Sequence, residues 1–577
     1  MAMLKNFLKQ LWMSRSFARK QDPIDAKTLA VWLETGLAAH RAGDLSGAEK
    51  QYRQILEHDP DHPEALFHLG TLAGAAGRFD AACELYQQAL AVRPDWFELR
   101  FCLGNALRSL GRFESAIGAM ETASWLKPDS VGARVNLAML FWESGRIREA
   151  EGIFRGLAEG NSDDARDARD NLLMMLSYRE DLTPQQCYAE HLRWAAHYAD
   201  PLTAAADPPT RPIDSERPLN IGYVSPDFRL HPVAIFLLPL LAHHDRERYR
   251  IHCYATRRFE DQTTVRLRAQ VQEWRDITAL SDDEAAKLIR DDGIDVLVDL
   301  AGHTGWNRLT LFARRPAPVQ VGWLGYLNTT GMRAMDARLT DAVATPPGLD
   351  AFHSERVVRL PYSQWCFQPI VEAPEVAPPP SRRDGRITFG AFHNLAKLGP
   401  GVIRQWSFLL KQIPHSRLLV MAKGLADGGH DLLDRFAAEG VAADRVALRN
   451  AVPYRDYLAT YREVDIALDA FPYSGGTTTC EALWMGVPVV TWACPAMPGR
   501  SAASLLSAAG LPELVADSPE AYLSIARELA DDPSRLENLR ATLRQRMLNS
   551  PLMDAQRFAG DVEEAFRGLW RAWCAGR

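Results

Sequence analysis

The stretch GGTTTCEALWMGVPVV, residues 475–490, has the composition of a phosphate-binding loop that leads into a helix. Alternating apolar residues at 464–469 predict a strand before it, and residues 471–476 predict the connecting loop. The two glycines let the backbone approach a ligand, and a helix beginning near Thr477 offers hydroxyls and free N–H groups to phosphate oxygens. A glycine-rich turn that merely caps an ordinary helix is the alternative reading.

This loop supplies the first candidate binding residues. Gly476, Thr477 and Thr478 stand where a phosphate would meet the start of the helix. Glu481 lies one turn further on, where its carboxylate can accept a hydrogen bond from a sugar hydroxyl. The stretch therefore indicates an enzyme that binds a nucleotide.

A 34-residue repeat occupies the N-terminal part of the chain. Four classes of position keep this step: Gly43, Gly77, Gly111 and Gly145; Ala48, Ala82, Ala116 and Ala150; Pro60, Pro94 and Pro128; Tyr52, Tyr86, Met120 and Phe154. Tetratricopeptide repeats have this pattern, in which glycine ends the first helix of a pair and proline ends the second. A generic helical bundle would not keep a fixed step at four positions.

We expect four helix pairs over about residues 28–160, within a helical domain of residues 28–200. Such repeats stack into a curved solenoid whose concave face binds extended polypeptide. The repeats therefore predict a protein partner.

Two α/β regions follow a Pro- and Ala-rich linker at residues 203–218. Short β-branched runs alternate with helical segments in residues 219–370 and again in residues 386–577, on either side of a proline-rich break. This alternation predicts two parallel sheets. The expected strands are 219–224, 250–255, 294–300 and 319–324 in the first region, and 387–392, 417–422, 445–448, 466–468 and 487–492 in the second.

The nucleotide-binding motifs of other α/β folds are missing from this sequence. No Gly-x-Gly-x-x-Gly follows a first strand and no Walker loop is present, which disfavours ordinary dinucleotide and P-loop proteins. The predicted fold is an α solenoid of tetratricopeptide repeats followed by a two-domain, twin Rossmann-like glycosyltransferase of the GT-B class.

Composition excludes several classes of protein. The 66 basic and 73 acidic residues give a net charge of −7, which disfavours nucleic acid as a main ligand. The eight cysteines show no Cys-x-x-Cys pair, so neither a zinc site nor a disulfide framework is indicated, and a cytoplasmic protein is expected. No apolar run approaches the roughly 20 residues needed to span a bilayer.

Residues 1–27 form a basic segment with an amphipathic pattern. No acidic residue occurs in the first twenty, and apolar side chains such as Leu4, Leu8 and Trp12 fall on one helical face. Contact of residues 1–20 with a membrane surface is one interpretation, and the alternatives are a cap on the first repeat and a frayed end.

Polar residues just after predicted strands are the candidates for chemistry, because ligands bind at the carboxyl ends of strands in open sheets. His231, His303 and His393 occupy such positions, and each can act as a base or donate to a sugar or phosphate oxygen. Lys397 precedes a helix and can neutralise a leaving diphosphate. Asp-x-Asp, the usual metal clamp for nucleotide sugars, occurs only at residues 59–61, so catalysis without metal or cofactor is expected.

The chain resembles the O-GlcNAc transferase and SPINDLY family. The resemblance rests on the repeats and on the motifs GYVSPDFRLH, LVDLAGHTGWNRL, PAPVQVGWLGY, FHNLAKL and GGTTTCEALWMGVPVV, and it extends over about residues 28–550. It implies a nucleocytoplasmic or bacterial inverting transferase that moves a sugar, most simply GlcNAc from UDP-GlcNAc, to Ser or Thr of proteins selected by the repeats.

The resemblance also implies roles for individual residues. His231 matches the histidine beside the sugar and acceptor that has been considered as base, with Asp227 and His303 as further candidate sugar or acceptor contacts. Lys397 matches the lysine on the diphosphate and Asn394 the polar residue near it. The family's phosphate-binding threonines and acidic ribose contact correspond to Thr477, Thr478 and Glu481.

Departures from the family pattern leave the donor open. Gly476 and Tyr457 stand where animal O-GlcNAc transferases carry histidine, although the Tyr457 ring can stack on either base. The alternatives are another donor on the same fold, either GDP-fucose or a bacterial sugar placed on flagellin, a repeat scaffold without catalysis, and simple hydrolysis of the nucleotide sugar.

Overall fold

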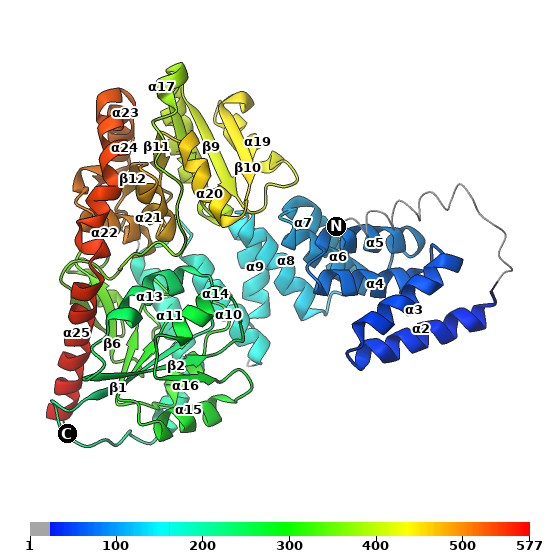
Figure 1. Ribbon diagram of the computed structural model, residues 1–577, viewed down its shortest axis with the longest axis horizontal. Helices are drawn as coiled ribbons and strands as arrows, with labels where there is room; N and C mark the ends of the chain where they lie inside the picture. The colour runs from blue at the N-terminus through cyan, green and yellow to red at the C-terminus, as the bar shows by residue number, and fades with distance from the viewer. Residues whose placement is uncertain (1–23, 161, 496, 577) are drawn as a thin grey trace. The chain divides into compact units, whose positions relative to one another are not determined.

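The computed structural model describes residues 24–160, 162–495 and 497–576 (Figure 1). The chain divides into two compact units, residues 1–144 with 424–429 and residues 145–423 with 430–577. Residues 1–23 of the expected N-terminal segment lie outside the described residues. The roles considered for residues 1–20 therefore stay predictions.

The first unit consists of helix pairs built on the 34-residue repeat. Its helices are α2 (Ala26–Arg41), α3 (Leu45–His58), α4 (Pro63–Ala75), α5 (Phe79–Val92), α6 (Phe97–Ser109), α7 (Phe113–Leu126) and α8 (Val131–Glu143). Gly43, Gly77 and Gly111 all have left-handed φ values between the paired helices, of 81°, 72° and 71°. The repeat predicted from the sequence is therefore confirmed.

Close helix packing within the first two pairs depends on a second glycine in each, at positions 36 and 70. A Cβ at Gly36 would lie 2.7 Å from the Tyr52 ring, and one at Gly70 would lie 2.6 Å from the Tyr86 ring. Both tyrosines are buried, so the large apolar position of each repeat packs directly against the backbone of the preceding helix.

The second unit begins with α9 (Ile147–Leu157), α10 (Asp163–Leu176), α11 (Pro184–Tyr198) and α12 (Asp200–Ala205). Leu173 and Trp194 of these helices share a hydrophobic core with Tyr254, Ile277 and Phe312 of the first α/β region. The sequence placed helices α9 to α11 in a repeat domain of residues 28–200. In the structure they belong to the same compact unit as the sheets.

Two parallel sheets form the centre of the second unit, as predicted. The first has the order β3-β2-β1-β4-β5-β6-β7, with β1 (Leu219–Ser225), β2 (Tyr249–Ala255), β3 (Glu273–Asp276), β4 (Val296–Asp299), β5 (Val319–Gly322), β6 (Ala337–Asp341) and β7 (Arg356–Leu360). The second has the order β10-β9-β8-β11-β12-β13, with β8 (Thr388–Ala391), β9 (Arg417–Ala422), β10 (Val446–Asn450), β11 (Ile466–Leu468), β12 (Val489–Trp492) and β13 (Val515–Ala516).

Helices α13 to α22 lie between strands of the two sheets, and α23 to α25 follow the last strand, β13. They are α13 (Pro232–His243), α14 (Gln262–Arg268), α15 (Asp282–Asp291), α16 (Leu309–Ala313), α17 (Ser381–Asp384), α18 (Pro400–Gln412), α19 (His430–Ala438), α20 (Tyr454–Thr460), α21 (Thr477–Trp484), α22 (Ser501–Ala508), α23 (Pro519–Ala530), α24 (Pro533–Leu548) and α25 (Ala555–Ala575). Within the described residues, no helix is both long enough and apolar enough to cross a membrane.

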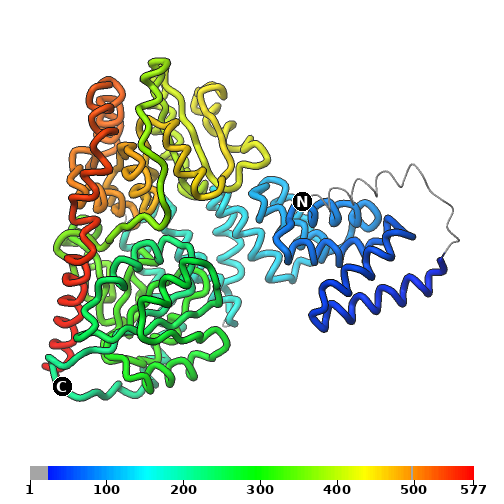
Figure 2. Tube along the Cα trace, in the orientation of Figure 1, coloured from blue at the N-terminus to red at the C-terminus, as the bar shows by residue number. Residues whose placement is uncertain are grey.

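The last helix, α25, returns to the first sheet. It packs against α13 and strands β5 and β7, and Figure 2 shows the trace running back from the second sheet to the first. Glu563 of α25 accepts a hydrogen bond from the His244 ring over 2.9 Å, and Arg567 donates to the Arg217 carbonyl oxygen over 2.8 Å. The second α/β region was expected at residues 386–577, but its final helix, α25, packs against the first α/β region.

Candidate functional site

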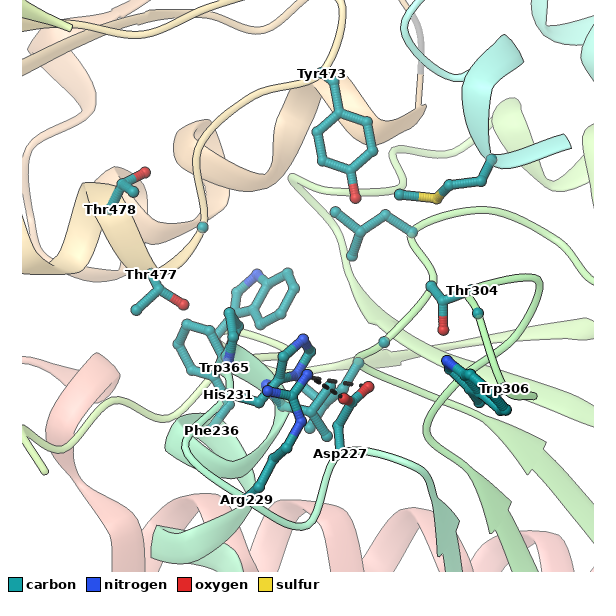
Figure 3. A pocket seen from close by; sticks show the side chains of 18 of the residues that line it. Asp227, Arg229, His231, Phe236, Thr304, Trp306, Trp365, Tyr473, Thr477 and Thr478 are labelled. Carbon is teal, nitrogen blue, oxygen red and sulfur yellow. Dashed lines mark hydrogen bonds and ion pairs between the residues drawn. The ribbon is translucent and has the colours of Figure 1, made fainter. Parts of the chain in front are cut away.

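A cavity of about 500 Å³ lies at the carboxyl ends of strands from both sheets. Six of the predicted site residues line it: Asp227, His231, Lys397, Gly476, Thr477 and Thr478. Figure 3 shows Thr477 and Thr478 on one side of this space and Asp227 and His231 on another. The two sheets thus contribute different chemical groups to one cavity.

The loop between β11 and α21 is fixed by a buried carboxylate. Asp469 accepts hydrogen bonds from the Gly475 N–H over 2.7 Å and from the Thr491 hydroxyl over 2.6 Å. Burial raises the pKa of Asp469 to about 6. A Cβ at Gly475 would lie only 2.5 Å from the Thr479 hydroxyl oxygen, so a larger residue here would force the loop or its neighbouring side chains to move.

The start of α21 faces the cavity without a side-chain cap. Gly476 precedes the helix and no side chain accepts from its first turn. The Thr477 hydroxyl is buried and has no hydrogen-bond partner among the described residues. Because a helix N-terminus carries partial positive charge and unpaired N–H groups, this end of α21 can bind an anion.

Lys397 adds a full positive charge beside the helix start. Its Nζ donates to the Ser474 carbonyl oxygen over 2.8 Å and lies 4.6 Å from the centroid of the Tyr473 ring. Burial lowers the pKa of Lys397 to about 8, and the nearby Asp469 carboxylate opposes that shift. The ammonium therefore stays mostly protonated at neutral pH.

His231 lies on the wall formed by the first sheet, at the N-terminus of α13. Its Nδ1 accepts a hydrogen bond from the Val233 N–H over 3.3 Å and lies 3.7 Å from an Asp227 carboxylate oxygen. Burial lowers the pKa of His231, with Asp227 opposing the shift, so the ring is neutral at pH 7. The bond from Val233 assigns the neutral ring's proton to Nε2, which is then a donor.

Glu481 and Tyr457 form a cluster that does not line the cavity. The buried Glu481 carboxylate accepts hydrogen bonds from the Tyr454 hydroxyl over 2.7 Å and from the Tyr457 hydroxyl over 2.9 Å. Burial raises the pKa of Glu481 to about 7. The ribose and base contacts expected for these two residues stay predictions, since in this structure the two side chains bind each other.

Asn394 also lies outside the lining of the cavity. Its side-chain oxygen accepts from the Ala396 N–H over 3.1 Å and so caps the short turn that carries Lys397. The contact near the leaving phosphate expected for Asn394 stays a prediction.

His303 is buried inside the protein rather than exposed to the cavity. Its two ring nitrogens bind the Asp170 carboxylate over 2.7 Å and the Thr330 carbonyl oxygen over 2.9 Å. The contact to sugar or acceptor expected for His303 has no support in this geometry, because neither nitrogen is available. The bond to Asp170 instead joins α10 to the loop after β4.

Several cavity residues were not singled out from the sequence. Arg229, Arg257 and Trp306 line the side formed by the first sheet. Arg257 comes two residues after β2. It is therefore a polar residue just after a strand, the same signal that identified the candidate histidines.

Residues 204–367 and 381–562 match the sequence profile of glycosyl transferase family 41, which covers more than half of the chain. The chain belongs to this family. Residues 33–98 and 101–165 of this family 41 protein match the tetratricopeptide repeat. The resemblance drawn from the sequence motifs is thereby confirmed.

Known relatives agree with this assignment. The family 41 chain is 40% identical over 424 residues to a Solanum lycopersicum protein named probable UDP-N-acetylglucosamine–peptide N-acetylglucosaminyltransferase SPINDLY. That alignment covers 72% of this chain and 45% of the relative. The Arabidopsis thaliana protein of the same name is 38% identical over 422 residues, covering 72% of this chain and 46% of the relative. The chain thus spans less than half the length of these curated relatives.

A solved structure extends the similarity through the repeats. A mutant O-GlcNAc transferase from Thermobaculum terrenum superposes with a TM-score of 0.73 at 38% identity, over 96% of this chain and 100% of that one. The similarity of the family 41 chain to a protein of that name thus includes both the repeats and the paired sheets.

Proposed function

We propose that this family 41 chain is a protein O-glycosyltransferase that moves GlcNAc from UDP-GlcNAc to Ser or Thr hydroxyls of proteins selected by its repeats. One observation carries the proposal. Lys397 and the uncapped start of α21 stand on one wall of a single cavity, and His231 stands on the other. An anion-binding wall opposite a hydrogen-bonding imidazole suits a reaction in which a diphosphate departs from a sugar.

In the proposed reaction the acceptor hydroxyl attacks the anomeric carbon as the bond from that carbon to the diphosphate oxygen breaks, with inversion of configuration. Lys397 and the N–H groups at Thr477 and Thr478 stabilise the negative charge that develops on the diphosphate. Because Nε2 of His231 is a donor, His231 orients the acceptor, and the hydroxyl proton passes to an oxygen of the departing diphosphate.

This mechanism needs no metal ion, since a lysine and a helix N-terminus supply the positive charge. Among the described residues, no cluster of three or more His, Cys, Asp or Glu side chains is arranged to hold a metal.

Calorimetric titration with UDP, GDP, UDP-GlcNAc and GDP-fucose tests the donor. Tight UDP binding that is lost in Lys397→Ala is the expected result, followed by sugar transfer from UDP-GlcNAc to protein. Preference for GDP would replace the proposed donor with GDP-fucose. Binding of none of the four would overturn the proposal in favour of another donor or a repeat scaffold without catalysis.

A further inference from the structure

Four side chains stack in alternation on the side of the cavity that carries His231. The Arg257 guanidinium carbon lies 4.3 Å from the centroid of the Trp306 ring and 4.9 Å from that of Phe259. The Arg229 guanidinium carbon also lies 4.9 Å from the Phe259 centroid. We call these residues, Trp306, Arg257, Phe259 and Arg229, the arginine–aromatic stack; Figure 3 shows its two labelled members, Arg229 and Trp306, beside the cavity.

The backbone at Trp306 is strained in the conformation that builds this stack. Trp306 has a left-handed φ of 65°, although its side chain is large and 68% of the residue surface is exposed. A left-handed conformation costs a non-glycine residue roughly 1–2 kcal/mol. The Thr256 hydroxyl holds the turn by donating to the Trp306 carbonyl oxygen over 3.3 Å. Strain kept at an exposed position beside a cavity points to a ligand contact.

The charges around the stack leave one cation without a counter-ion. Arg229 pairs with Asp227 over 3.2 Å, and the neighbouring Glu260 pairs with Arg268 over 2.7 Å. Arg258 pairs with Asp276. Within the described part of the chain, Arg257 forms no ion pair, and its guanidinium lies against the two aromatic rings.

Stacking leaves the hydrogen-bonding edge of a guanidinium free. The two rings lie over the guanidinium carbon of Arg257, while the N–H groups of a guanidinium lie in its own plane and match the geometry of a carboxylate. The stack therefore presents planar donors that the fold itself does not use.

We propose that Arg257, with Arg229 beside it, binds the side-chain carboxylate of an Asp or Glu that flanks the acceptor Ser or Thr in the protein substrate. This inference rests on the proposed function, since it assigns the specificity of that acceptor. Arg229 is two residues from His231 and both contact Asp227, so the anion would bind next to the hydroxyl that His231 orients. Lys397 and α21 line the opposite wall and are left for the diphosphate.

Peptides test the inference. We would measure transfer from UDP-GlcNAc to a set of Ser- and Thr-containing peptides in which each flanking position is in turn Asp, Glu, Asn or Gln. If the Arg257 guanidinium pairs with the peptide carboxylate, kcat/KM should be about ten- to a hundredfold higher for the best acidic peptide than for its amide counterpart. Arg257→Gln should bring this ratio close to one.

Arg258→Gln is the matched control. Arg258 is adjacent in sequence, its side chain is 75% exposed, and it pairs with Asp276 outside the lining of the cavity. The acidic preference should persist in this variant. Equal transfer to acidic and amide peptides by the unaltered protein, or an unchanged ratio in Arg257→Gln, would overturn the inference.

Binding measurements separate this inference from the proposed function. Peptides with Ala in place of the acceptor residue are titrated into UDP-saturated protein, where an acidic preference that is lost in Arg257→Gln supports the anion site. That preference without any sugar transfer would overturn the transferase proposal and leave the anion site standing. A loss of UDP affinity in Arg257→Gln as large as that in Lys397→Ala would instead assign Arg257 to the donor and overturn the inference.

Discussion

The Nζ of Lys397 donates a hydrogen bond to the Ser474 carbonyl oxygen over 2.8 Å. This bond joins the turn after β8 to the loop after β11, so the two neighbouring central strands of the second sheet deliver one cationic wall. The ammonium keeps two further protons for a ligand beside the start of α21. The position of the charge is therefore set by the same loop that carries Gly475 and Gly476.

Lys397→Ala should lower kcat for transfer about a hundredfold or more, because removal of one preorganised donor from a developing oxyanion typically costs that much. UDP affinity should fall as well, while the thermal unfolding midpoint stays close to that of the unaltered protein. Steady-state kinetics, calorimetry and thermal melts check these three quantities. Lys397→Arg, which keeps the charge, should retain more activity than the alanine variant, and near-normal turnover in Lys397→Ala would remove the leaving-group role.

The tautomer of His231 predicts which replacement preserves activity. Because Nδ1 accepts from the Val233 N–H, Nε2 acts as a donor, and an amide N–H can partly replace it. We expect His231→Gln to retain at least about tenfold more activity than His231→Ala, the worth of roughly one hydrogen bond. Measured pH profiles of kcat/KM should show the same acid limb in the unaltered protein and in His231→Gln. Loss of that limb in the glutamine variant would instead make His231 a general base.

Gly475→Ala should damage the donor side of the cavity. The new Cβ would meet the hydroxyls of Thr479 at 2.5 Å and Thr478 at 2.9 Å, so the loop must move and UDP affinity should drop about tenfold or more. Gly152→Ala is the matched control. A Cβ added at this helical position would meet no neighbouring atom within 4 Å, and alanine stabilises a helix interior by about 0.5–1 kcal/mol relative to glycine. Unchanged UDP binding in Gly475→Ala would show that the loop adapts without cost.

Asp170→Ala should destabilise the protein without touching the donor. Removing this carboxylate leaves the Nδ1 of the buried His303 without its partner and takes one of two acceptors from the Asn307 amide, which typically costs about 1–3 kcal/mol. The thermal midpoint should fall by several degrees. At temperatures below the midpoint, UDP affinity should match that of the unaltered protein. A selective loss of UDP binding would instead indicate that His303 contacts a ligand.

Local patterns made part of this site predictable. The helix α21 begins at Thr477 as expected, because a glycine pair followed by three threonines determines its own turn and helix start. The repeat glycines were predictable for the same reason, since each ends a helix within its own repeat. Such features depend on residues that are close together in the sequence.

Contacts between distant segments were not predictable in this way. His303 follows a strand, as a ligand-binding histidine would, yet Asp170 binds it from 133 positions away. Likewise the Tyr454 hydroxyl reaches Glu481 from 27 positions away, and α25 returns to the first sheet. These arrangements depend on how the domains pack, which no local spacing encodes.

Glu481 should make the stability of the protein depend on pH. Its pKa of about 7 lies above the ordinary value of 4.5, because burial disfavours the charged form more than the two tyrosine hydroxyls favour it. The folded protein therefore binds this proton more tightly than the unfolded chain does. The resulting stabilisation is fully present below pH 4.5 and is lost as the pH rises through about 7. Its upper limit is about 3 kcal/mol.

Glu481→Gln removes this proton equilibrium, so the variant should gain thermal stability relative to the unaltered protein as the pH is raised from below 4.5 to above 7. The gain should amount to several degrees in the unfolding midpoint. Glu513→Gln, at an exposed position, controls for the loss of one negative charge. The measured quantity is the difference in unfolding midpoint between the variant and the unaltered protein at each pH. The effects of Asp469 and Lys397 titration on the two midpoints therefore largely cancel. Parallel melting curves for Glu481→Gln and the unaltered protein at every pH would show that the tyrosine pair fully compensates the buried charge.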